Sequence, residues 1–331
     1  MAAAKKEGVV SLASTQDPSK RDAMLQFQKT YPDIRVDYAS LSFADYETRI
    51  TPERAAGVYS FDAYSSGVGD AVFKQEIPNG WYEPIKPSLY LPEVLDEKSW
   101  LGGFDGGFLD TGKKYVFGYG FTVLNYTVVN RDMVAEAALN TYADLLKPEF
   151  KGKIAILDAE RVGAGNLTLT AIRSAIGDDR MKQLLVDQQP VSTSDRRQIA
   201  EWVIRGTYPI GIGVADSFLK PFHDEGLGKN VRAITGATPV TVASGEGTLM
   251  LLTKAPHPNA AKVFVNWLLS RAGQTEWATH TLANSRRLDV PKGNPDGVVD
   301  QEHLDRYVND GTEENVGKKQ AMLDFANQVM L

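Results

Sequence analysis

Short apolar runs alternate with amphipathic stretches through the first 70 residues of the chain. Residues 9–13 are predicted to form a strand, and the polar turn at 14–18 leads into a stretch with apolar residues at helical spacing. The same sequence of strand, turn and helix is predicted again over residues 34–56 and begins once more at 61–70. This repeated order is typical of an open α/β sheet with helices on both faces.

The pattern changes in the middle of the chain. Residues 86–112 are rich in proline, glycine and aromatic residues, which predicts irregular surface structure. Residues 115–129 then form one long extended run, and residues 231–242 form a second. Because most strands have about 5–6 residues, we expect each run to carry the chain from one lobe to another.

Between these two runs the strand, turn and helix pattern returns. Helices are predicted at 142–146, 168–176 and 198–205, and strands at 153–157 and 208–214. The chain therefore reads as two α/β lobes. Its 331 residues, 43% of them apolar, are enough for two cores of about 150 residues each.

Charge and cysteine content exclude several classes of protein. The chain has 42 acidic and 36 basic residues, a formal charge of −6, which argues against a nucleic-acid partner. It has no cysteine, so disulfides, zinc–thiolate sites, iron–sulfur clusters and thiol nucleophiles are excluded. The four histidines, at 223, 257, 280 and 303, have no metal-ligand spacing, and we predict neither a metal site nor a cofactor.

The sequence does not decide between a cytoplasmic and an exported protein. No apolar run reaches the roughly 18 residues that a membrane-spanning helix needs. The first seven residues lack the apolar segment of a secretion signal, which fits a cytoplasmic protein or a chain that begins where a signal was removed.

Small and hydroxyl-bearing residues recur in the turns that follow predicted strands. In open α/β sheets ligands bind beyond the carboxyl ends of the strands, where free N–H groups at helix starts attract anions. Serine and threonine also cap helices routinely, so each turn alone is ambiguous. The recurrence of such turns in both lobes favours a ligand role for the following residues: Ser14, Thr15, Ser66, Gly67, Gly165 and Asn166.

Three further segments contain charged residues that are considered as ligand contacts. Residues 192–197 precede a helix and are either a capping run or an anion site in which Thr193 and Arg197 take part. Asp216 and Ser217 follow the strand at 208–214. The pair Arg286 and Arg287 is interpreted as exposed surface.

No catalytic motif is present. The sequence has neither a GxSxG elbow nor a Walker loop, and no paired acid and base or activated nucleophile stands out. We therefore predict a protein without catalytic residues, and a cytoplasmic transferase-type enzyme is the weaker alternative.

Residues 254–270, with Gly273 and Gln274 after them, closely resemble a segment of the extracellular solute-binding proteins of ABC importers, in the branch often described as iron(III)-type. Residues 145–154, 206–212 and 4–10 support this resemblance, which covers roughly residues 4–330. It implies a type II periplasmic binding-protein fold, with two α/β lobes of open mixed sheets joined by crossing strands. Lobe 1 would be residues 1–120 and 236–300, and lobe 2 residues 121–235 and 301–331.

The resemblance also implies partners and a location. The protein would be a monomer in the periplasm, would bind a small-molecule ligand between its lobes, and would deliver it to the membrane permease of an ABC importer. A sensor subunit that signals to a membrane kinase would have the same fold and is kept as an alternative.

The ligands that ferric-ion members use are missing. Such members hold the metal through two adjacent tyrosines after the strand that corresponds to 208–214, where this chain has Asp216, Ser217 and Phe218. The histidine of the first turn and the glutamate of the second are replaced by Ser14-Thr15-Gln16 and Ser65-Ser66. Neutral hydroxyl groups are poor ligands for Fe(III).

We therefore expect a small organic anion, a carboxylate, phosphate or phosphonate, and keep ferric ion or a ferric chelate as the alternative. Asp216 would also accept an ammonium group, which makes a zwitterion a candidate. Two aromatic residues beside the hinge, Tyr119 and Phe121, are expected to stack on a ring or alkyl part of the ligand.

Overall fold

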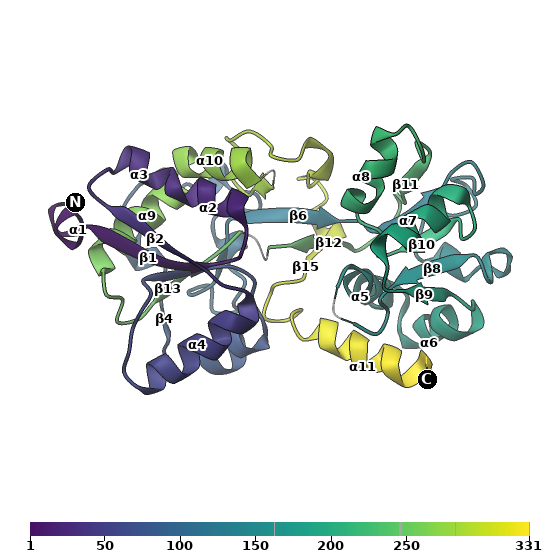
Figure 1. Ribbon diagram of the computed structural model, residues 1–331, viewed down its shortest axis with the longest axis horizontal. Coiled ribbons are helices and arrows are strands. Elements are labelled where there is room, and N and C mark those ends of the chain that lie inside the picture. The colour runs from purple at the N-terminus through teal and green to yellow at the C-terminus, as the bar shows by residue number, and fades with distance from the viewer. Residues whose placement is uncertain (162, 245–246, 282, 331) are drawn as a thin grey trace. The chain divides into compact units, whose positions relative to one another are not determined.

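The computed structural model describes residues 1–161, 163–244, 247–281 and 283–330 and divides the chain into two compact units (Figure 1). Unit 1 consists of Met1–Thr122, Ala243–Leu304 and Asn309–Val316. Unit 2 consists of Val123–Val242, Asp305–Val308 and Gly317–Leu331. The short return of the chain to unit 1 at Asn309–Val316 was not predicted from the sequence.

Unit 1 is built on a mixed sheet whose strands run in the order β2-β1-β3-β13-β4, with β5 paired to β13. β1 is parallel to both β2 and β3, whereas β13 is antiparallel to its neighbours. The strands are β1 (Val9–Ser14), β2 (Arg35–Ser40), β3 (Ala63–Ser65), β4 (Tyr82–Glu83), β5 (Phe117–Gly118) and β13 (Thr248–Leu252).

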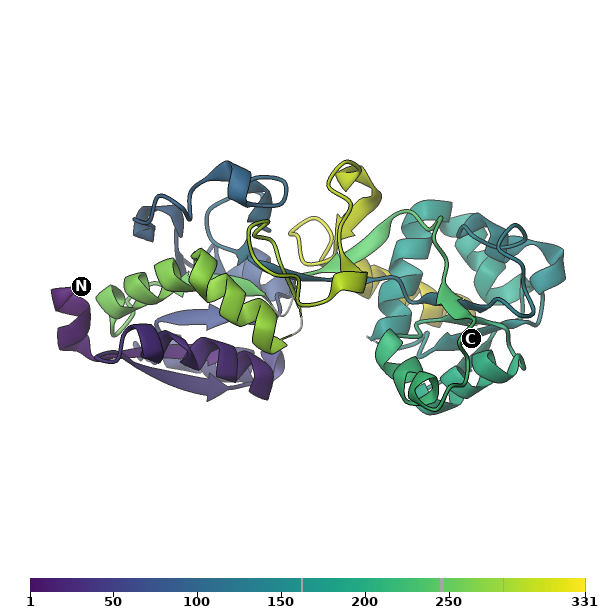
Figure 2. The same ribbon diagram turned by 90° about the horizontal axis from the view of Figure 1, so that it is seen from above.

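Alternating side chains of this sheet enter two different cores. Val10 and Leu12 of β1 belong to the apolar core beneath α2, α9 and α10, while Ala13 belongs to the core beneath α4. The two faces are accordingly covered by different helices, and α10 packs along α2 (Figures 1 and 2). The unit-1 helices are α1 (Ala2–Glu7), α2 (Pro18–Leu25), α3 (Phe27–Thr30), α4 (Phe43–Ala55), the π-helix η1 (Val72–Glu76), α9 (Pro258–Leu269) and α10 (Arg271–Thr281).

Short 3-10 turns fill the segment that the sequence predicted to be irregular. They are η2 (Lys86–Ser88), η3 (Glu97–Ser99) and η4 (Asp105–Gly107), and η8 (Pro295–Gly297) and η9 (Leu304–Arg306) occur near the end of the chain. The helix α1 was not predicted.

Unit 2 has a second mixed sheet, in the order β11-β7-β10-β8-β9. β8, β9 and β10 are parallel, and β7 is antiparallel to β10 and β11. The strands are β7 (Thr127–Asn130), β8 (Ile154–Leu157), β9 (Val191–Thr193), β10 (Ile210–Ile212) and β11 (Val231–Ala233).

Both faces of this sheet are covered by helices. Ile154 and Ile156 of β8 share a core with α5, α6 and α11, whereas Ala155 and Leu157 pack with α7 and α8. The helices are η5 (Ala143–Leu146), η6 (Pro148–Phe150), α5 (Ala164–Ile176), α6 (Asp178–Lys182), η7 (Gln183–Asp187), α7 (Arg196–Arg205), α8 (Asp216–Asp224) and α11 (Lys318–Met330). The helix expected at 142–146 is a 3-10 helix.

The strands at which the chain passes from one unit to the other belong to a third sheet, of order β14-β6-β12-β15. These are β6 (Gly120–Leu124), β12 (Val240–Ala243), β14 (Asn284–Ser285) and β15 (Tyr307–Asn309). Each predicted long run is therefore divided, the first into β5, β6 and β7 and the second into β11 and β12. Among the described residues, no helix combines the length and apolarity that crossing a bilayer would require.

Candidate ligand-binding site

Two turns of unit 1 lie side by side because their strands are parallel neighbours. Ser14 ends β1 and Ser65 ends β3, and the two residues are partners in the register. The hydroxyl of Ser14 donates a hydrogen bond to the carbonyl oxygen of Ser65 at 2.5 Å, and the Lys20 ammonium donates to the same oxygen at 2.6 Å. Ser14 and Lys20 are fully buried, so the contact between the turns is part of the folded core.

The hydroxyl of Ser65 extends this network to a third strand. It donates to the carbonyl oxygen of Thr248 at 2.6 Å and lies 2.9 Å from the hydroxyl of Tyr119. The Tyr119 ring is fully buried and packs edge-to-face on Trp277, with centroids 5.1 Å apart. Tyr119 therefore contributes its hydroxyl group to the turns, while its ring packs in the core. Phe121 lies on β6, opposite Asn284, and is also buried.

The remaining turn residues of unit 1 differ in how their polar groups are used. The Ser66 carbonyl accepts a hydrogen bond from the Thr248 hydroxyl, and the Gly67 carbonyl accepts one from Tyr64 at 3.2 Å. Thr15 Oγ1 is buried and has no hydrogen-bond partner within the described part of the chain. Of these groups, the Thr15 hydroxyl is left with unused bonding capacity.

The turns of unit 2 lie at one edge of its sheet. β8, β9 and β10 are parallel, and each is followed by a helix, α5, α7 and α8 respectively. Asp195 caps α7 by accepting from the N–H groups of Arg197 and Gln198 at 2.8 and 3.0 Å. α5 and α8 begin after Gly163 and Ala215, and among the described residues neither start has a side-chain cap. Two helices therefore present uncapped N–H groups, which favour an anion, at this edge.

Glycines allow these turns to approach one another. A Cβ atom on Gly165 would lie 1.5 Å from the carbonyl oxygen of Leu157, so only glycine fits in the first turn of α5. Gly213, after β10, has a φ of +86°, and a Cβ there would lie 2.6 Å from Gly165 Cα. The start of α5 thus rests directly on the backbone that ends β8 and β10.

Asn166 and Thr193 are both engaged within unit 2. The fully buried Asn166 donates from Nδ2 to the Lys319 carbonyl of α11 at 3.2 Å, and its Oδ1 has no hydrogen-bond partner among the described residues. The Thr193 hydroxyl donates to Gln198 Oε1 at 2.6 Å.

Arg197 and Asp216 lie on different helices. The exposed guanidinium of Arg197 pairs with Glu201 one turn along α7, at 3.0 Å, and lies over the Phe222 ring. Asp216 and Ser217 are exposed in the first turn of α8. Burial and then the Asp216 charge raise the pKa of Tyr126 above its usual value.

Two residues at these turns were not predicted from the sequence. Tyr126, whose carbonyl accepts from the N–H groups of Gly213 and Val214, lies inside a segment that the hydrophobic pattern assigns to a continuous strand. The spacing of apolar residues predicts that Lys20 lies on the polar face of an amphipathic helix. A contact between Lys20 and Ser65 joins residues 45 positions apart and leaves no local signal.

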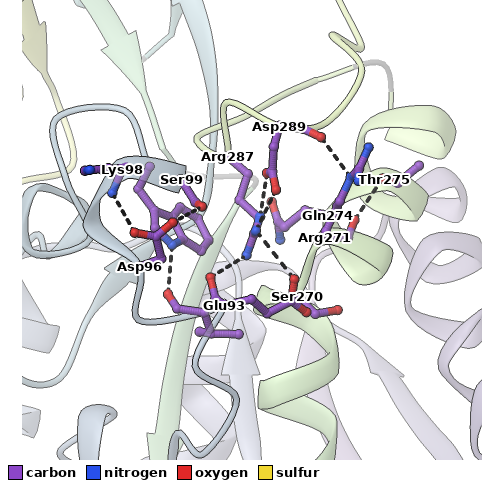
Figure 3. A network of polar contacts seen from close by, with 12 residues as sticks. Glu93, Asp96, Lys98, Ser99, Ser270, Arg271, Gln274, Thr275, Arg287 and Asp289 are labelled. Carbon is purple, nitrogen blue, oxygen red and sulfur yellow. Dashed lines mark hydrogen bonds and ion pairs between the residues drawn. The ribbon is translucent and has the colours of Figure 1, made fainter.

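The surface interpretation of Arg287 is wrong. This side chain is only 1% exposed, its guanidinium pairs with Asp289 at 2.8 Å, and it donates to the carbonyls of Glu93 and Leu269 (Figure 3). Its guanidinium also lies over the ring of Trp100. Five fixed N–H donors let arginine satisfy several buried acceptors, which explains why a cation occurs here in the interior.

Within the described residues, no group of three or more histidine, aspartate or glutamate side chains is placed to hold a metal ion. What the structure provides is two α/β units, each with polar turns at the carboxyl ends of parallel strands, and a chain that crosses repeatedly between them. These features define the class of two-lobed ligand-binding proteins.

Comparison with known proteins agrees with this class. The sequence profile of the bacterial extracellular solute-binding proteins matches residues 12–275. The chain belongs to this family, whose members are the ligand-binding subunits of ABC importers. A search of curated proteins found no match.

Solved structures confirm the predicted two-lobed periplasmic binding-protein fold. Iron-bound HitA from Pseudomonas aeruginosa is similar at a TM-score of 0.66 and 16% identity, over 98% of this chain and 99% of that one. The Trichodesmium protein IdiA (FutA), in complex with iron and citrate, gives 0.67 and 17% over 97% and 99%. The ferric binding protein of Bordetella gives 0.67 and 17% over 97% and 98%.

Proposed function

We propose that this receptor binds a small organic anion or zwitterion, of the carboxylate, phosphate or phosphonate type, and delivers it from the periplasm to the permease of an ABC importer. The turns of both units would contact the ligand, and hinge closure of the two units would form the state that the permease binds. No catalytic step is proposed, because the role needs only selective binding and release.

We infer an anionic ligand from the two helix starts in unit 2. At the edge of the sheet where β8 and β10 end, α5 and α8 both begin without a side-chain cap from any residue that the structure describes. The contact between Gly165 and Gly213 holds the two helix starts together. Backbone N–H groups in this arrangement favour an anionic group, and the Thr15 hydroxyl supplies a further donor in unit 1.

The charge of Asp216 favours a zwitterionic ligand over a purely anionic one. Its exposed carboxylate lies in the first turn of α8 and acts on Tyr126 through its charge. A carboxylate at this position would oppose a purely anionic ligand and would attract an ammonium group. An aminophosphonate or amino acid would satisfy both the helix starts and Asp216.

Ferric ion or a ferric chelate is the second candidate, because HitA and the Trichodesmium protein were solved with iron. The latter also holds citrate, which is itself an organic anion. The candidate ligand contacts in these turns include hydroxyl groups and one carboxylate, Asp216, whereas a bare Fe(III) ion would favour several anionic oxygens. A chelate that presents carboxylates is therefore favoured over the free ion.

The first test is a thermal-shift panel of carboxylates, phosphates, phosphonates, amines, neutral sugars and Fe(III)-citrate. A ligand at 100 times its dissociation constant stabilises the folded state by about 2.7 kcal/mol, which corresponds to a rise in Tm of roughly 5–10 °C. We expect a rise with one class of anion or zwitterion. A rise with amines or sugars alone would contradict the proposal.

The variant Asp216→Asn separates the two ligand types. Binding of a zwitterion should weaken about tenfold or more, while binding of its amine-free analogue should be unchanged or tighter, because a repelling charge is removed. Asp224→Asn, at the opposite end of α8, is the matched control. Equal losses for both ligands would exclude the zwitterion, and isothermal titration calorimetry gives the dissociation constants.

A further inference from the structure

Unit 1 contains an arginine, Arg286, whose charge is not paired with a carboxylate. Arg286 follows β14, and its main chain is held on both sides: its N–H donates to the Tyr119 carbonyl and its carbonyl accepts from the Leu101 N–H, both at 2.8 Å. The side chain is half-buried, and Nη2 donates to the Leu101 carbonyl. Among the described residues, no carboxylate forms an ion pair with this guanidinium.

The carboxylates nearest to Arg286 along these segments have other partners. Asp105, in the η4 turn, pairs with Lys86. Asp289, three residues further along the chain, pairs with Arg287 at 2.8 Å. The two adjacent arginines therefore differ, because Arg287 has its counter-ion within the fold and Arg286 does not.

The Arg286 side chain also has unused hydrogen-bond donors. Its Nε is buried and has no hydrogen-bond partner within the part of the chain that the structure describes. Burial lowers the pKa of Arg286 to about 10, and no charge of a described residue offsets this effect. Native proteins rarely bury a cation or a donor without a partner, and such a group often marks an ion or water that belongs there.

Two glycines leave this guanidinium open to small solutes. Gly102 and Gly106 are both exposed, and a Cβ atom on them would lie 3.7 and 3.3 Å from Nη2 of Arg286. Neither residue has a side chain that would close the approach from solvent or supply a carboxylate. The planar fork of a guanidinium matches the oxygen atoms of phosphate and carboxylate groups.

A water molecule and an anion would satisfy Arg286 differently. A water would accept a hydrogen bond from Nε but would leave the charge uncompensated. We propose that Arg286 binds a small oxyanion, a phosphate or carboxylate group, beside the loop at residues 102–106 of unit 1. The oxyanion would accept the unused hydrogen bonds and neutralise the charge as well.

Such an anion would stabilise a segment that is connected to one of the unit-1 turns. The Arg286 N–H holds the Tyr119 carbonyl, and the Tyr119 hydroxyl lies 2.9 Å from that of Ser65. An anion that fixes Arg286 would therefore also hold Tyr119 in place. The inference does not depend on which ligand the receptor carries, because that ligand class was inferred from the helix starts of unit 2.

The test uses the whole chain in phosphate-free buffer, titrated with sodium phosphate at constant ionic strength. At about ten times the dissociation constant, the Tm should rise by roughly 3–5 °C. Arg286→Met keeps the apolar stem, removes the charge and should lose this rise. Arg35→Met, at an exposed position of β2, is the matched control and should keep it. Because phosphate also stabilises folded proteins without a specific site, the difference between wild type and Arg286→Met is the quantity to measure.

Nitrogen-15 NMR of the arginine side chains provides a readout that a purely structural arginine would not change. Phosphate should shift one Nε–H signal of the wild type, the signal that is missing in Arg286→Met. If Arg286→Met does not fold, Gly106→Val decides the question, since it keeps the arginine, closes the approach from solvent and should weaken phosphate binding about tenfold or more.

Two results would overturn the proposal. A wild type whose Tm and Nε–H signals are unaffected by phosphate would make Arg286 a structural residue held by Leu101 alone. A phosphate effect that Arg286→Met and Gly106→Val retain would place the anion at another site, such as the ligand-binding turns. The second result would contradict this inference and leave the proposed function intact.

Discussion

Arg287 and Lys20 show how single side chains depart from what their type predicts. Both are cations, and both are almost completely buried in unit 1. Arg287 donates hydrogen bonds to the backbone carbonyls of Glu93 and Leu269, and Lys20 donates one to the carbonyl of Ser65. Burying a charge is tolerated only where it gains such partners, and these partners come from distant parts of the chain.

Another single residue, Asp144, predicts how the free energy of unfolding depends on pH in the acid range. Its carboxylate accepts hydrogen bonds from the Asn140 and Thr141 N–H groups, at 3.0 and 2.8 Å, and pairs with Lys147 at 2.8 Å. Partial burial opposes ionisation, but these bonds outweigh it and hold the pKa of Asp144 well below its usual value. Because the folded-state pKa is lowered, the stabilisation is present above the ordinary carboxyl pKa near 3.8 and is lost as the pH falls through the folded-state pKa.

We therefore expect Asp144→Asn to lower the free energy of unfolding by about 1–2 kcal/mol at pH 7. The difference from wild type should shrink below about pH 4, where the ionised carboxylate begins to lose its advantage. Urea unfolding at pH 7 and pH 3 measures both values, and Asp187→Asn, at an exposed position of unit 2, is the control. An equal deficit at both pH values would contradict this account.

At the scale of elements, the start of α5 depends on a close approach of backbones. In Gly165→Ala the new methyl group would overlap the Leu157 carbonyl, which belongs to the backbone and cannot rotate away. We expect a loss of about 3 kcal/mol in the stability of unit 2, measured by urea unfolding. Gly163→Ala should cost less than about 1 kcal/mol, because its Cβ would meet no atom of the other described residues within 4 Å. Similar losses for the two variants would show that the close approach is not the cause.

Strand β1 and helix α5 show what the sequence pattern can and cannot predict. Strand β1 was predicted to within one residue, because five consecutive apolar or small residues end at a polar turn. The helix α5 begins at Ala164 and not at 168, because glycines that resemble a loop are required for packing against Leu157. Local propensity opposes glycine in a helix, and here tertiary contact overrides it.

The candidate site was predictable to a similar extent. The polar turns after β1, β3, β8 and β10 follow from the position of apolar runs, and parallel pairing brings Ser14 beside Ser65. The break in the first long run was not predictable, because it depends on the Tyr126 carbonyl accepting from Gly213 and Val214, about 90 residues away. Pairing between distant segments leaves no trace in local periodicity.

At the scale of the whole molecule, hinge closure can be tested by fluorescence energy transfer. The chain has no cysteine, so Val58→Cys in unit 1 and Val186→Cys in unit 2 would be the only labelling sites. Both positions are exposed, at 48% and 41%. A compound that raises the Tm in the panel should also change the transfer efficiency of this pair, because the proposed closure would move one unit relative to the other.

A pair within unit 1, Val58→Cys with Leu95→Cys, is the control and should show no change. A Tm rise without any change in transfer between the units would mean that the compound binds to one unit alone. That outcome would contradict closure while leaving ligand binding itself intact.

The placement of β13 has a consequence for the order in which the protein is made. This strand pairs with β3 and β4 in the sheet of unit 1, yet it is encoded about 180 residues after β3. At roughly 5–20 residues per second, a ribosome takes about 10–40 s to cover that distance. All five strands of the unit-2 sheet are synthesised within this interval, so the second unit completes its sheet first. The nascent chain meanwhile carries β3 with an open edge, and a chaperone that covers unpaired strands would act during this interval.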